Sequence, residues 1–171
     1  MKIQHRESER HVLTITVDNE PGILAKITGL FTARGYNIDS LTVADISEDH
    51  ALSRITIVTG GPPQVIDQIM AQLDRLVPVH RVIDLTEAGP HVERELALIK
   101  VTGTGENRVE ALRLADVFRA RPVDTTIESF IFELTGPPDK IDSFIALMRE
   151  IGLVEVGRTG IVGMMRGSEG A

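Results

Sequence analysis

Hydrophobic and polar residues alternate along residues 11–17 (HVLTITV), which predicts a β-strand with one buried face. A turn-forming stretch, residues 18–22, follows, and then apolar side chains recur with the spacing of one helical face. Strand and helix patterns continue to residue 85 and predict the order β-α-β-β-α-β. The predicted strands are 11–17, 38–46, 52–59 and 79–85, and the apolar helix positions are Ile23, Leu24, Ile27, Leu30 and Phe31, then Val65, Ile66, Ile69, Met70 and Leu73.

The second half of the chain repeats this pattern. A polar segment that contains Gly-Pro, residues 87–95, is expected to be a linker. After it, strands are predicted at 96–101, 121–125, 129–135 and 153–162, and helices over the apolar positions of 111–118 and 141–148. We therefore expect a polar tail (1–10), a first domain (11–86), the linker (87–95), a second domain (96–163) and a C-terminal tail (164–171).

An internal repeat supports this division. Residues 59–67 read TGGPPQVID and residues 135–142 read TGPPDKID, so in both halves a strand ends at Gly-Pro-Pro. Proline suits the first helical turn, where its missing N–H costs nothing. The predicted fold class is α+β, with two tandem ferredoxin-like βαββαβ domains. Because helices cover only one face of each antiparallel sheet, we expect side-by-side packing or dimerisation to cover more of the surface.

Composition excludes several binding functions. The chain of 171 residues has a net charge of -7 and 4% aromatic residues, which argues against a nucleic-acid partner. Cysteine is absent, so disulfides and thiolate chemistry are excluded, and a cytoplasmic protein is expected. No apolar run is long enough to span a membrane, and the first twenty residues lack the apolar core of a secretory signal.

Catalytic and metal-binding motifs are also missing from the pattern. The histidines are scattered, without a helical pair of ligands, and we expect ordinary surface or sheet positions for them. The glycine-rich stretch 102–106 lacks the third glycine of a dinucleotide fingerprint and the Lys-Ser/Thr of a phosphate-binding loop. We therefore expect no catalytic residue, no metal site and no cofactor on this chain.

The candidate binding segment is residues 18–24 (DNEPGIL), where a strand ends and a helix begins. Free backbone N–H groups and the helix dipole favour a carboxylate at such a position, and Gly22 lets a ligand approach the backbone. The amide of Asn19 can both donate and accept hydrogen bonds. The alternative, which the residues alone favour, is that Asn19 merely caps the helix.

Residues 19–43 (NEPGILAKITGLFTARGYNIDSLTV) resemble the ACT domain of the small regulatory subunit of acetohydroxyacid synthase, also called acetolactate synthase. The run GLFxxRGYNIxSLTV is specific to that family. The stretches LSRITI (52–57), LADVFRAR (114–121) and EVGRTG (155–160) resemble it too, so the resemblance covers nearly the whole chain.

The resemblance implies a non-catalytic regulator in branched-chain amino-acid biosynthesis. Its partner would be a catalytic large subunit that holds thiamine diphosphate, FAD and magnesium. The small subunit would activate that partner and make it sensitive to valine or a related amino acid. In the effector site, Asn19, Gly22, Ile23 and Leu24 would supply one side, and Asn37 and Ile38 of a second ACT domain would supply the other across a homodimer interface.

Other functions of a βαββαβ unit remain to be weighed. An RNA-recognition module needs exposed aromatic residues on its central strands, and residues 52–59 contain none. A metallochaperone needs a cysteine pair, which is absent. The strongest alternative is a free-standing amino-acid sensor that regulates another enzyme or a transcription factor. Identification of the partner would distinguish it from a synthase subunit.

Overall fold

The computed structural model describes residues 9–168 and residue 170. The expected N-terminal tail lies outside these residues up to position 8, and its last two residues already belong to the first strand. The described chain forms two compact units. The first contains the residues up to Val92 and again those from Ile161 onward, and the second contains Glu93–Gly160.

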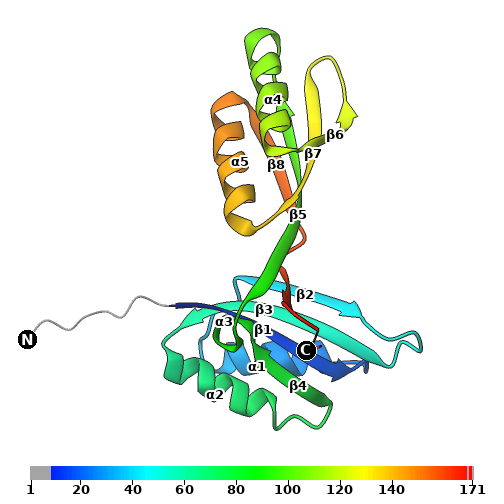
Figure 1. Ribbon diagram of the computed structural model, residues 1–171, viewed down its shortest axis with the longest axis vertical. Coiled ribbons are helices and arrows are strands. Elements are labelled where there is room, and N and C mark those ends of the chain that lie inside the picture. Colours follow the sequence, from blue (N-terminus) through cyan, green and yellow to red (C-terminus); the bar gives the residue numbers. More distant parts are fainter. Residues whose placement is uncertain (1–8, 169, 171) are drawn as a thin grey trace, which may run out of the picture. The chain divides into compact units, whose positions relative to one another are not determined.

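The first unit is a four-stranded antiparallel sheet with two helices on one face (Figure 1). The strand order is β2-β3-β1-β4, and the neighbouring strands pair in antiparallel register. This confirms the predicted fold class and the βαββαβ order. The elements are β1 (Glu9–Asp18), α1 (Ile23–Ala33), β2 (Ser40–Asp45), β3 (Leu52–Gly61), α2 (Pro63–Leu73) and β4 (Val79–Asp84).

The helices lie on the sheet because their apolar faces match its alternating residues. Odd-numbered residues of β1 point toward the helices. Three of them, Leu13, Ile15 and Val17, share one core with the helix positions predicted from the sequence, and its fully buried members include Leu13, Ile15, Ile27 and Leu73. Burial of each large aliphatic side chain contributes about 1.5–3 kcal/mol to folding.

The opposite face of the first sheet is covered in part by the C-terminal segment, which the sequence analysis placed elsewhere. Ile161 is buried in a small cluster with Val12, Val58 and Leu85, and Ile83 and Met165 pack against it. The backbone N–H of Ile161 donates to the hydroxyl of Ser40 (2.9 Å), and the hydroxyl of Thr42 donates to the carbonyl of Ile161 (3.2 Å).

The predicted strand 153–162 is therefore two strands, β8 (Leu153–Arg158) and β9 (Val162–Met165). β9 pairs with β5 (His91–Thr102), and residues 164 and 165 of the expected tail belong to it. Packing is tight here, because a Cβ on Gly163 would lie 2.5 Å from Cδ1 of Leu85 and 3.3 Å from Cγ1 of Val12. The second domain thus ends before the predicted boundary at 163.

The expected linker, residues 87–95, also has regular structure. Its first residues complete the short helix α3 (Leu85–Ala88), and residues from His91 onward form the start of β5. The polar composition of these residues suggested a linker. Residues 91–93 are half-buried in β5, and a half-buried strand can carry polar side chains.

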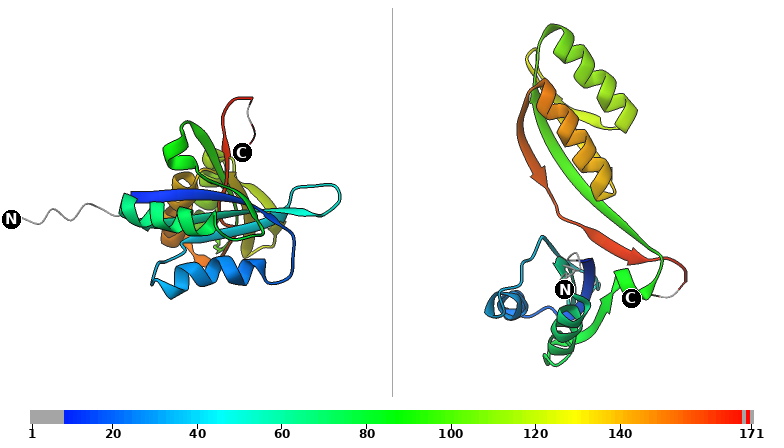
Figure 2. Two further views of the ribbon diagram at one scale, coloured as in Figure 1. Left: turned by 90° about the horizontal axis from the view of Figure 1, so that it is seen from below. Right: turned by 90° about the vertical axis from the view of Figure 1, so that its left-hand side faces the viewer.

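The second unit repeats the architecture with the strand order β6-β7-β5-β8. Its helices lie side by side on one face of the sheet (Figure 2). The weak strand predicted at 121–125 is present at the sheet edge, with a register shift after Pro122. The remaining elements are α4 (Gly105–Phe118), β6 (Arg121–Thr125), β7 (Ser129–Gly136) and α5 (Pro138–Ile151).

Aromatic residues organise the core of this unit. Phe132 and Phe144 are fully buried and meet edge to face, with ring centroids 6.0 Å apart.

Across the described residues, no helix combines the length and apolarity that a membrane crossing requires.

Candidate functional site

The turn between β1 and α1 is held by backbone hydrogen bonds to both neighbours of β1. The N–H of Asp18 donates to the carbonyl of Pro78 on the β4 side, and the N–H of Asn19 donates to the carbonyl of Ala51 on the β3 side, each at 2.8 Å. The N–H of Ile23 donates to the carbonyl of Glu20 (3.3 Å). The turn is therefore part of the sheet's end rather than an independent loop.

Gly22 is the N-cap of α1 and has a left-handed backbone conformation, with φ 85°. Residues with a Cβ adopt this conformation at a cost of roughly 1–2 kcal/mol, which explains glycine at this position. A Cβ on Gly22 would have no atom within 4 Å. The position that a side chain of residue 22 would take is therefore open, and a helix N-terminus offers free N–H groups to a small anion.

Asn19 does not cap α1, because no side chain forms a capping hydrogen bond there. Its Nδ2 instead donates to Oδ1 of Asp45 (3.0 Å) and to the carbonyl of His50 (2.9 Å). The capping alternative is therefore wrong. Asn19 ties the candidate site to the β2–β3 hairpin, and its amide is oriented by these two contacts.

The hairpin beside Asn19 is rich in acidic groups. Asp45 also accepts a hydrogen bond from the hydroxyl of Ser53 (3.2 Å), and its Oδ2 lies 2.9 Å from Nδ1 of His50. The Ser47 hydroxyl and the Ala51 N–H lower the pKa of Asp49 below its usual value. A helix N-terminus beside anionic side chains suits a zwitterion, since one end attracts a carboxylate and the other an ammonium group.

Ile23 and Leu24 have different environments. Ile23 is 7% exposed and belongs to the core of the first unit, whereas Leu24 is 38% exposed. Within one chain, only the side chain of Leu24 is therefore available to line a pocket. Ile23 could contribute its backbone at the helix start, because its side chain is buried in the core.

Asn37 and Ile38 lie at the other end of β2. Asn37 is exposed, its Nδ2 donates to Oδ1 of Asp39 (2.6 Å), and its carbonyl accepts a hydrogen bond from the hydroxyl of Thr59 (2.6 Å). Ile38 is half-buried against the core. Along β3, Ser53 marks the Asn19 end and Thr59 the Asn37 end, a separation of about 20 Å at the rise of a strand. One chain does not bring the two predicted halves of the site together.

Sequence reasoning missed the partners of Asn19. Asp45 and His50 lie 26 and 31 residues away in the chain, where the pattern predicts only the end of one strand and the segment before the next. Only the hairpin pairing of β2 with β3 brings them to Asn19, and no local motif carries that information.

Comparisons with known proteins cover nearly the whole chain. A family model described as "Small subunit of acetolactate synthase" matches residues 94–167, and one described as "AHAS small subunit-like ACT domain" matches residues 13–81. The chain is 46% identical over 160 residues to a probable acetolactate synthase small subunit of Archaeoglobus fulgidus, covering 94% of this chain and 99% of the relative. It is 44% identical over 161 residues to the isozyme 3 small subunit of Escherichia coli, covering 94% and 98%.

A solved structure agrees with these matches. The crystal structure of the acetolactate synthase small subunit from Thermotoga maritima has a TM-score of 0.83 and 39% identity. The match covers 94% of this chain and 99% of that one.

Proposed function

Because this chain belongs to the family of acetolactate synthase small subunits, we propose that it regulates a catalytic large subunit of acetolactate synthase. In this proposal it activates that subunit and makes it sensitive to valine or another branched-chain amino acid. Similarity to named small subunits over almost the full length of both chains carries the proposal. The thiamine diphosphate, FAD and magnesium would be held by the catalytic partner.

The turn at Gly22 is the proposed effector site. The effector's α-carboxylate would meet the N–H groups at the start of α1, where the left-handed Gly22 leaves open space. The α-ammonium group would lie toward Asp45 and the side chain of Asn19, which already contact each other. An aliphatic side chain would pack against Leu24, which is partly exposed.

A second copy of the chain would complete this site. β2 is an edge strand of the first sheet, so its outer hydrogen-bonding groups are available to another strand. If two β2 strands pair antiparallel around a two-fold axis, the start of one strand lies beside the end of the other. Asn37 and Ile38 of one protomer would then lie beside Asn19 and Gly22 of its partner.

Reconstitution tests the proposed function. The purified chain is added to an acetolactate synthase catalytic subunit with its cofactors, and acetolactate formation is measured with and without valine. We expect a rise in activity on addition, a fall across a valine titration, and no acetolactate from the chain alone. Failure of the two chains to co-elute, together with unchanged activity, would leave the amino-acid sensor of another enzyme as the better explanation.

A further inference from the structure

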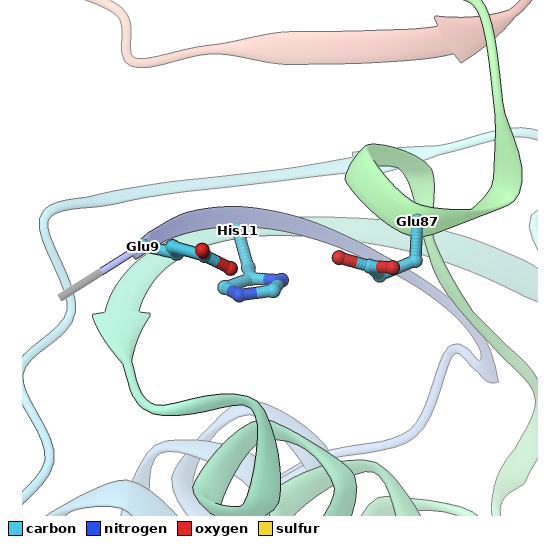
Figure 3. Close-up of side chains that lie close together, drawn as sticks. All are labelled: Glu9, His11 and Glu87. Carbon is cyan, nitrogen blue, oxygen red and sulfur yellow. The ribbon is translucent and has the colours of Figure 1, made fainter. Parts of the chain in front are cut away.

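Two carboxylates and an imidazole gather at the start of β1, at the opposite end of that strand from Asn19. Glu9 and His11 lie two residues apart on β1 and so face the same side, and Glu87 lies on α3. One ligand-type atom of each residue lies within 4.8 Å of those of the others. Figure 3 shows the His11 ring between the two carboxylates, which turn toward it from opposite sides. We call Glu9, His11 and Glu87 the β1–α3 cluster.

His11 has an unusual environment for a histidine. Its side chain is 1% exposed, and its Nδ1 lies 2.6 Å from Oδ2 of Asp84. Because a carboxylate accepts hydrogen bonds, Nδ1 carries the hydrogen and Nε2 of the neutral ring carries a lone pair. Nε2 is buried, and no hydrogen-bond partner for it exists among the described residues. A buried, unpartnered ring nitrogen of this kind is available to coordinate a cation.

The same short network positions the rest of the cluster. Oδ1 of Asp84 accepts a hydrogen bond from the N–H of Thr86 (2.9 Å) and so caps α3, the helix that carries Glu87. The hydroxyl of Thr86 in turn accepts a hydrogen bond from the N–H of Val12 on β1 (3.1 Å). Asp84 therefore orients the His11 ring and anchors α3 beside it. Such supporting contacts are typical of preorganised metal sites.

We propose that the β1–α3 cluster binds a divalent transition-metal cation through Nε2 of His11 and one carboxylate oxygen each of Glu9 and Glu87. One imidazole with two carboxylates suits zinc better than magnesium, which prefers oxygen ligands alone. Bound metal would occupy the lone pair of the buried Nε2, neutralise the two carboxylates and connect β1 with α3. No metal site was expected from the sequence, because the histidines are scattered without a helical pair of ligands; Glu87 is 76 residues from His11 in the chain.

Zinc titration of the full-length, metal-free chain tests the proposal. Isothermal titration calorimetry should give one Zn²⁺ per chain, at least about tenfold weaker binding of Mg²⁺, and a raised unfolding temperature with Zn²⁺. The double variant Glu9→Gln/Glu87→Gln keeps the size of both side chains and leaves the buried His11–Asp84 pair intact, so it should fold. We expect it to lose Zn²⁺ binding and the thermal shift.

Glu48→Gln is the matched control, because it neutralises an exposed glutamate of the same unit outside the cluster. It should bind Zn²⁺ as the wild type does. In side-chain NMR spectra, the Nε2 resonance of His11 should shift on addition of Zn²⁺. Absence of wild-type binding at millimolar Zn²⁺, or binding that persists in the double variant, would overturn the proposal. In the latter case the exposed pairs of His50 with Asp45 and His80 with Asp18 would be the sites.

Discussion

Gly22 has a left-handed backbone and open space at the position of a Cβ, and one substitution there tests the proposed effector site. Gly22→Asp adds a negative side chain where the effector carboxylate is proposed to lie, so repulsion should weaken valine binding. We expect the valine concentration for half-inhibition of the reconstituted complex to rise at least about tenfold, which corresponds to about 1.4 kcal/mol. Activation should persist, because the subunit contact is a separate site.

Gly22→Asn separates charge from bulk, since asparagine has the size of aspartate and tolerates the left-handed conformation. It should weaken valine binding less than Gly22→Asp does. Normal valine sensitivity of Gly22→Asp would show that the effector binds elsewhere. Loss of activation in a folded variant would place this turn in the subunit interface.

Arg158 pairs with a buried carboxylate in the second unit. It donates two hydrogen bonds to Glu95, at 2.7 and 2.6 Å, and Glu95 is only 4% exposed. These bonds raise the pKa of the Arg158 guanidinium above its ordinary value. Arg158→Met would leave a buried carboxylate without its cation, and we expect the free energy of unfolding to fall by about 1.5–3 kcal/mol in urea titrations.

Lys100→Met supplies the comparison in the same unit. Lys100 pairs with Glu155 at 3.1 Å, but both side chains are well exposed. Exposed pairs contribute roughly 0–1 kcal/mol, so this variant should be nearly neutral. Equal losses for the two variants would show that Glu95 is not sensitive to its partner.

At the scale of elements, β9 is the strand whose position the sequence did not predict. Gly163→Ala would place a Cβ 2.5 Å from Leu85, so we expect a loss of about 1–3 kcal/mol in unfolding free energy from overpacking. Gly157→Ala on β8 is the control, because a Cβ there meets nothing within 4 Å. Thermal unfolding followed by circular dichroism compares the two. A stable Gly163→Ala variant would mean that β9 moves away from Leu85 at little cost.

The predictable and unpredictable parts of the fold differ in the range of their interactions. Local periodicity predicted α1 from Ile23 and Phe31 and predicted the order of strands and helices along each half of the chain, because those signals lie within a few residues. The partner of β9 depends on packing against Val12 and Leu85, which no local pattern encodes. The candidate site behaves in the same way. Gly22 was found from its own turn, whereas Asp45 reaches Asn19 only through the pairing of β2 with β3.

At the scale of the whole molecule, the edge of β2 is where a second copy would complete the proposed effector site. Ile46 donates its N–H to Leu52 of β3 (3.0 Å), so strand alternation directs the N–H of Val43 outward. Val43→Pro removes that outward donor without removing a β2–β3 bond. We expect the wild type to be a dimer at micromolar concentration by light scattering, and Val43→Pro to be a monomer that binds valine weakly.

Val43→Thr controls for the lost methyl groups, since threonine keeps the branched shape and the N–H. It should remain dimeric. A monomeric wild type in the presence of valine, or a Val43→Pro variant that still dimerises, would mean that the protomers do not meet through β2.

The return of Ile161 and β9 to the first unit has a consequence for synthesis on the ribosome. Residues 93–160 form a continuous insertion between two parts of the first unit. This inserted unit has all its strands as soon as β8 has left the ribosome. The first unit begins earlier in the chain, yet Val12 and Val58 pack against Ile161, which is translated only after the inserted unit. The part of the protein that is translated first is therefore the last to complete its structure, and a fragment ending at residue 92 exposes that apolar cluster.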